Sequence, residues 1–148
     1  MAMRKALMNG KSLKANENRP PGHRVVVAGV DATSCTELAG ALRDEGFVVA
    51  ELGSALHVLK ALGGRTRDRS PIDLLVLDVS DRHLVGTRLL EAVRGEDWSL
   101  PIVVITDRAS PPLKADFHRL EALAVFEKPV DTARVAHTLR TALASSAY

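Results

Sequence analysis

The sequence is poor in aromatic residues and cysteine, and these absences exclude several kinds of protein. Aromatic residues make up only 3% of the 148 residues, so few rings are available to stack on nucleic-acid bases. The single cysteine, Cys35, cannot form an internal disulfide, and it excludes a zinc site built from cysteines. The five histidines stand singly along the chain and do not indicate a metal site. We therefore expect an aliphatic core, with Cys35 as a small packed residue on a helix.

Long apolar runs are also missing. No stretch approaches the roughly 20 residues that a membrane-spanning helix needs, and the basic N-terminus has no apolar segment of the kind found in signal peptides. These absences predict a cytoplasmic protein without membrane contact. A Walker-type glycine-rich loop is absent as well, so the sequence offers no loop of this kind to cradle nucleotide phosphates.

Charge is distributed unevenly between residues 1–22 and the rest of the chain. Residues 1–22 contain five of the 20 lysines and arginines but only one of the 18 acids, and they end in Pro20-Pro21-Gly22. A segment of this kind without hydrophobic periodicity predicts a disordered basic leader. Residues 23–148 are then expected to form one domain, because this length suffices for one hydrophobic core and little more.

Strands and helices are expected to alternate along residues 23–148. Continuous aliphatic runs are typical of strands buried on both faces, and apolar residues three to four apart indicate helices. The expected strands are Arg24–Ala28, Phe47–Ala50, Asp73–Asp78, Pro101–Thr106 and Ala124–Phe126. The expected helices are Asp31–Glu45, one capped by Ser54 that ends at Gly63-Gly64, Val85–Arg94, Pro111–Leu123, and a last one capped by Asp131. Five strand–helix repeats predict an α/β fold in which helices cover both faces of a parallel sheet.

Three reactive side chains stand at the ends of predicted strands. Asp78 ends the third strand, Thr106 ends the fourth, and Lys128 follows the fifth. Because ligands bind beyond the carboxyl ends of strands in open α/β sheets, we expect these side chains at one edge. Each alone could have a local role: Asp78 could cap a turn, Thr106 could bond nearby backbone, and Lys128 could be solvated. Together they suit phosphoryl transfer to Asp78, with Lys128 neutralising charge and Thr106 donating to a phosphoryl oxygen.

With these motifs identified, the sequence resembles the receiver domain of bacterial two-component response regulators, of the chemotaxis-regulator type, over about residues 24–144. The resemblance rests on Leu74–Asp78, on Gly86 with Leu89 and Leu90, on Pro101–Thr106 and on Glu127–Pro129. It implies a flavodoxin-like three-layer sandwich with a five-stranded parallel sheet of order 2-1-3-4-5 and five helices.

The resemblance also assigns roles to individual residues. It implies that Asp78 is the phosphoacceptor and that Thr106 and Lys128 are the switch and phosphate-binding residues. It further implies a cis peptide bond between Lys128 and Pro129, which proline chemistry allows. No residue is expected to be catalytic in an enzyme's sense, since the family is a signalling module.

The sequence departs from the family where magnesium is expected. Receivers place two adjacent acids after the first strand, and these positions fall on Gly29 and Val30, whose side chains have no oxygen to offer a hard cation. The remaining candidate ligands for a Mg²⁺ ion are Asp31, which stands one residue late, Asp78 and the backbone carbonyl of Ser80. Loss of the two acids is expected to weaken Mg²⁺ binding and to slow phosphorylation.

Other departures surround the three reactive side chains. Asp107 replaces the small residue that usually follows the switch threonine, which adds a negative charge where a phosphate would arrive. Asp81 or Asp107 could instead supply a replacement oxygen to a metal. Val125 stands where the family often has an aromatic residue that couples phosphorylation to the surface.

The first functional hypothesis is a stand-alone response regulator. It would accept a phosphoryl group on Asp78 from a histidine kinase or phosphotransfer protein and act by contact with an unknown downstream protein or in a homodimer. No DNA-binding domain is expected, because the chain ends just after the last predicted helix.

Two alternatives remain open at this stage. Gly29 and Val30 favour a pseudo-receiver, an interaction module that works without phosphorylation. Its contact face would consist of the fourth and fifth strands and their helices, where Lys114, His118 and Arg119 stand. A flavin- or nucleotide-binding enzyme on the same fold is the third class, and the missing phosphate loop argues against it.

Overall fold

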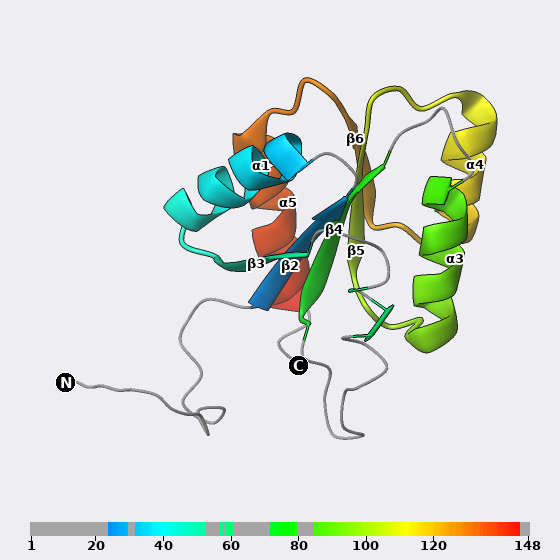
Figure 1. Ribbon diagram of the computed structural model, residues 1–148, viewed down its shortest axis with the longest axis horizontal. Coiled ribbons are helices and arrows are strands. Elements are labelled where there is room, and N and C mark those ends of the chain that lie inside the picture. Colours follow the sequence, from blue (N-terminus) through cyan, green and yellow to red (C-terminus); the bar gives the residue numbers. More distant parts are fainter. Residues whose placement is uncertain are drawn as a thin grey trace.

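The computed structural model describes residues 24–29, 32–52, 57, 59–60, 72–79 and 85–145. Five strands in this part of the chain form one parallel sheet in the order β3-β2-β4-β5-β6 (Figure 1). The strands are β2 (Arg24–Gly29), β3 (Val48–Leu52), β4 (Leu74–Val79), β5 (Ile102–Thr106) and β6 (Ala124–Glu127). Numbered along the chain, this is the predicted order 2-1-3-4-5.

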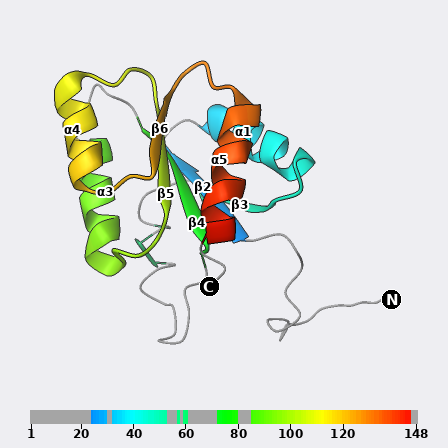
Figure 2. The ribbon, with the colours of Figure 1, turned by 180° about the vertical axis from the view of Figure 1, so that it is seen from behind.

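Helices cover both faces of the sheet. They are α1 (Ala32–Asp44), α3 (Val85–Glu96), α4 (Pro111–Arg119) and α5 (Thr132–Ser145). Helices α1 and α5 lie on one face and α3 and α4 on the other, as both views show (Figures 1 and 2). The flavodoxin-like sandwich is therefore confirmed. Residues 1–22 and most of the helix expected after Ser54 lie outside the described residues. Within the described ranges, no helix has the length and apolar character needed to cross a membrane.

The sheet separates two hydrophobic cores. Successive side chains of a strand point to opposite faces, so Val25 and Val27 belong to one core while Val26 and Ala28 belong to the other. Cys35 lies in the first of these, at 5% exposure, as expected for a small packed residue. Burial on both faces explains why the central strands read as continuous aliphatic runs.

The ends of two helices have identifiable causes. Helix α1 ends as predicted, before Gly46, whose φ of 99° is a conformation that glycine adopts without steric cost. The prediction of a helix over Pro111–Leu123 is wrong at its end, because α4 stops at Arg119. Glu121 takes a left-handed φ of 59°, and the N–H of Leu123 donates instead to the carbonyl of Ile102 at 2.7 Å. The chain turns there to enter β6.

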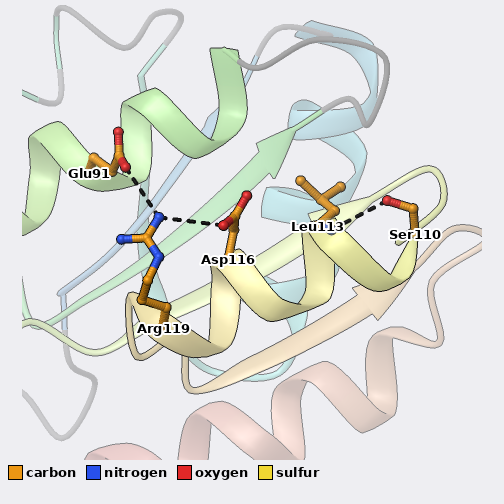
Figure 3. A network of polar contacts seen from close by, with 5 residues as sticks. All are labelled: Glu91, Ser110, Leu113, Asp116 and Arg119. Atoms are coloured by element: carbon orange, nitrogen blue, oxygen red, sulfur yellow. Dashed lines mark hydrogen bonds and ion pairs between the residues drawn. The ribbon is translucent and has the colours of Figure 1, made fainter.

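Helix α4 is held at its start and along its outer surface. The hydroxyl of Ser110 caps the helix by accepting a hydrogen bond from the N–H of Leu113 at 3.3 Å (Figure 3). At the other end of the helix, the guanidinium of its last residue, Arg119, pairs with Glu91 of α3 at 3.2 Å and with Asp116 at 3.5 Å. The Arg119 side chain therefore links α3 to α4.

Candidate functional site

Asp78 is the penultimate residue of β4, the buried central strand. All six residues of β4 are buried, and the Asp78 side chain is only 3% exposed. Parallel pairing places Asp78 beside Gly29 of β2 and Ile105 of β5, which fixes it at the carboxyl edge of the sheet. A buried carboxylate is costly unless a charged or hydrogen-bonding partner compensates it. Its position alone therefore indicates that a partner must be nearby.

Lys128 is that partner. Its Nζ lies 2.9 Å from Oδ1 of Asp78, so two side chains 50 positions apart in the sequence form a close ion pair. The backbone holds Lys128 in place, because its N–H donates to the Thr106 carbonyl at 2.9 Å. The peptide bond between Lys128 and Pro129 is cis, as the resemblance implied. Burial lowers the pKa of Lys128, but the hydrogen bond and charge of Asp78, together with those of Asp107, raise it more, so that the pKa lies above its ordinary value.

Thr106 belongs to the same edge, and its hydroxyl is turned to the local backbone. The residue is fully buried, and Oγ1 donates to the carbonyl of Arg108 at 3.4 Å. A bond of this length is weak. The hydroxyl of Thr106 therefore contacts nearby backbone, and the carbonyl of the residue accepts the hydrogen bond from the N–H of Lys128. Its role as a switch stays a prediction.

Asp107 is brought to the site by its position directly after β5. Its Oδ1 lies 3.5 Å from Nζ of Lys128, on a side chain that is 56% exposed. Lys128 therefore lies between two carboxylates, a close one that is buried and a more distant one that is open to solvent. Sequence periodicity gives no sign of this second contact.

The described residues do not fit a magnesium site. A Cβ added at Gly29 would lie 2.6 Å from both the Cβ and the carbonyl oxygen of Asp78, so no larger side chain fits there without movement. No group of three histidine, cysteine or acidic side chains within the described residues could hold a metal ion. Val30, Asp31, Ser80 and Asp81 lie outside the described residues.

Glu127 makes a contact at this edge that the sequence did not reveal. Its Oε2 accepts a hydrogen bond of 2.8 Å from the N–H of Ala109, a residue that is 6% exposed. The bond ties the β5–α4 loop to β6, next to both Thr106 and Lys128. Because Glu127 ends a short strand among half-buried residues, its carboxylate could equally have been solvated, and no sequence pattern distinguishes the two.

Replacing Glu127 by alanine is expected to free this loop. The N–H of Ala109 would lose its acceptor, and an unpaired buried N–H costs about 1–3 kcal/mol. Hydrogen exchange of the Ala109 amide is expected to become faster in Glu127→Ala, whereas Glu127→Gln keeps an acceptor oxygen and should retain most of the protection. Equal protection in the wild type and Glu127→Ala would show that the bond does not hold the loop.

Fold and site together define a receiver-type domain, in which a carboxylate at the end of the central strand pairs with a lysine that precedes a cis-proline. The chain belongs to the response regulator receiver domain family, whose sequence model matches residues 25–140. The resemblance inferred from the motifs is therefore confirmed.

Individual relatives agree with this assignment. The transcriptional regulatory protein ZraR of Escherichia coli O157:H7 is 27% identical over 120 residues, which cover 81% of this chain and 26% of that protein. The chain thus spans about a quarter of this curated relative. A receiver domain protein of the CheY-like kind from Methanospirillum hungatei JF-1 has a TM-score of 0.71 at 20% identity, over 84% of this chain and 95% of that one. NtrX from Brucella abortus has a TM-score of 0.69 at 26% identity, over 84% of this chain and 27% of its own.

Proposed function

We propose that this receiver domain accepts a phosphoryl group on Asp78 from a histidine kinase or phosphotransfer protein and passes the signal on by protein contact. The observation that carries the proposal is the 2.9 Å pair of Asp78 and Lys128 at the carboxyl edge of the sheet. The chain covers only 26% of the curated relative, so the role of the whole relative does not carry over to it. Action as a stand-alone regulator in a two-component phosphorelay is therefore part of the proposal.

The geometry suggests how each residue contributes to the transfer. An oxygen of Asp78 would attack phosphorus while the bond from phosphorus to the donor breaks, and the donor group leaves with the bonding electron pair. The Lys128 ammonium, already beside the attacked position, would balance the charge gathering on the phosphoryl oxygens. The Thr106 hydroxyl gives up only a weak bond of 3.4 Å if it rotates toward a phosphoryl oxygen.

Output by contact would use the face formed by α4, β6 and α5. A groove of about 890 Å³ lies there, and its lining includes Lys114, His118, Val125, Glu127 and Arg134. Within the described residues, Lys114, His118 and Arg134 take part in none of the ion pairs, whereas Arg119 is already paired with Glu91 and Asp116. The lining also holds two acids, Glu127 and Asp131, but both already accept hydrogen bonds from backbone N–H groups. The basic groups, which form none of the ion pairs in the described part of the chain, therefore suit a downstream partner with acidic side chains.

A second candidate is the pseudo-receiver, which would bind partners without being phosphorylated. Gly29 is the observation that favours it, because the 2.6 Å approach to Asp78 leaves no room for an acid at a position where the family has one. In this candidate the Asp78–Lys128 pair would serve to stabilise the carboxyl edge. The two candidates differ in one measurable property, the reactivity of Asp78.

Phosphoryl transfer to Asp78 can be tested with a small phosphodonor. The protein is incubated with phosphoramidate over a wide range of Mg²⁺ concentrations, and its intact mass is followed with time. We expect the mass of one phosphoryl group to be gained by the wild type and by the control Asp44→Asn, an exposed acid in the last turn of α1. Asp78→Asn should gain nothing. Equal labelling of Asp78→Asn, or none in the wild type at any Mg²⁺ concentration, would leave the pseudo-receiver as the better account.

A further inference from the structure

Exposure increases along the three linked groups of the site. Asp78 is 3% exposed, Lys128 25% and Asp107 56%, and Lys128 contacts the other two. The buried carboxylate, Asp78, is the proposed phosphoacceptor, and Asp107 is the exposed one. Of the two carboxylates that contact Lys128, Asp107 is therefore the more accessible to solvent.

The two contacts of Lys128 differ in strength. The contact with Asp78 is 2.9 Å long and involves a buried carboxylate, whereas the contact with Asp107 is 3.5 Å long and involves an exposed one. Exposed ion pairs contribute little to stability and separate readily. An anion that needs the Lys128 ammonium will therefore displace Asp107 and leave the pair with Asp78 intact.

The net charge of the three residues repels an incoming anion. Two carboxylates against one ammonium leave the three residues with one net negative charge. Coulomb repulsion grows in proportion to the charge of the incoming group. A donor with two net negative charges is therefore repelled by Asp107 about twice as strongly as a donor with one.

We propose that Asp107 is a charge gate: its carboxylate holds the outer side of Lys128, must yield it to the incoming phosphoryl group, and so selects against doubly charged small phosphodonors. The inference rests on the proposed function and adds the specificity of the same site. In the gated step, Asp78 forms a bond to phosphorus as the donor's bond to phosphorus breaks, and the leaving group departs with that electron pair. The Asp107 carboxylate moves away from Lys128 into solvent and neither gains nor loses an atom.

Two phosphodonors test the gate. Acetyl phosphate carries two net negative charges at neutral pH, and phosphoramidate carries one. Asp107→Asn is expected to raise the ratio of the two labelling rates (acetyl phosphate over phosphoramidate) by about fivefold, the effect of one unit charge at contact distance in a water-like medium. Asp44→Asn changes the net charge of the protein equally but far from the site, and it should leave the ratio unchanged. A ratio that does not change in Asp107→Asn, or that changes equally in Asp44→Asn, would overturn the gate.

A binding measurement separates the gate from the proposed function. Inorganic phosphate is titrated into unmodified protein, and the amide signals of Thr106, Asp107 and Lys128 are followed by NMR. The gate predicts that Asp107→Asn binds phosphate several-fold more tightly than the wild type, with the difference shrinking as salt is added. Equal affinities would contradict the gate. Tighter binding without labelling of any variant would support the gate and refute the proposed phosphoryl transfer.

Discussion

Substitution of alanine for Gly29 is expected to destabilise the domain by about 1–3 kcal/mol, the usual cost of forcing extra atoms into a packed region. The added Cβ would lie 2.6 Å from two atoms of Asp78, one of them a backbone oxygen, and 3.0 Å from Sγ of Cys35. Backbone cannot rotate away as the end of a flexible side chain can. Strands β2 and β4 would therefore have to separate beside the proposed phosphoacceptor.

Gly29→Asp is expected to cost more than Gly29→Ala. It adds the same steric conflict and places a second carboxylate next to the buried Asp78. An acid at this position should therefore destabilise the protein more than alanine does.

Gly40 provides a matched control for these substitutions. It lies in α1, where an added Cβ has no atom within 4 Å, and alanine at a helical glycine usually stabilises by about 0.5–1 kcal/mol. Urea unfolding followed by the fluorescence of Trp98, the one tryptophan of the chain, gives the free energies. A Gly29→Ala variant as stable as Gly40→Ala would contradict the close approach of β2 to β4.

The second large effect is expected at Arg94, which is 3% exposed at the end of the sheet opposite to Asp78. Its guanidinium joins two segments of backbone, because it donates to carbonyls in the connection between α3 and β5 and in the connection between α4 and β6. The acceptors are Leu120 (2.8 Å), Asp97 (3.2 Å), Trp98 (3.1 Å), Leu100 (2.6 Å) and Glu121 (2.9 Å). Burial lowers the pKa of Arg94, while the charges of Glu121 and Asp97 act in the opposite direction.

Arg94→Met is expected to lower the free energy of unfolding by about 3–5 kcal/mol. Methionine fills similar space but donates no hydrogen bond, and each buried acceptor left unpaired costs about 1–3 kcal/mol. Lysine at this position should restore only part of the loss, because a single ammonium cannot span carbonyls that the planar guanidinium reaches together.

Arg88 is the matched control for this experiment. It is an exposed arginine of the same helix, and none of the ion pairs within the described part of the chain involves it. Arg88→Met should stay within about 0.5 kcal/mol of the wild type, as surface changes usually do. Urea unfolding followed by circular dichroism measures both variants, and similar losses in Arg94→Met and Arg88→Met would contradict the structural role of Arg94.

The architecture was predictable because it depends on patterns that local sequence carries. Continuous aliphatic runs such as Leu74–Leu77 identify strands buried on both faces, and alternation with helices leaves few arrangements open. The end of α4 was mispredicted because Leu120 and Leu123 continue the helical periodicity, while the left-handed turn at Glu121 depends on the docking of β6 against β5.

The candidate site was predictable for a different reason and to a smaller extent. Parallel strands end at one edge, so the ends of β4 and β6 indicated that Asp78 and Lys128 would lie near each other. The contacts of Asp107 with Lys128 and of Glu127 with Ala109 depend on the path of the loop after β5. Loop paths follow from tertiary packing, and periodicity does not encode them. The inward position of Arg94 likewise became visible only through its backbone acceptors.

Titration with beryllofluoride, which mimics a phosphoryl group on a carboxylate, tests most directly whether Asp78 is a phosphoacceptor. Amide NMR spectra of the wild type and Asp78→Asn are compared as beryllofluoride is added at several Mg²⁺ concentrations. The wild type is expected to show shifts that centre on Thr106, Ala109 and Lys128. Lys128 contacts Asp78, and hydrogen bonds link Thr106 to Lys128 and Ala109 to the adjacent Glu127. Asp78→Asn should show none. A wild-type spectrum that stays unchanged at every concentration, or the same shifts in both proteins, would contradict phosphorylation at Asp78.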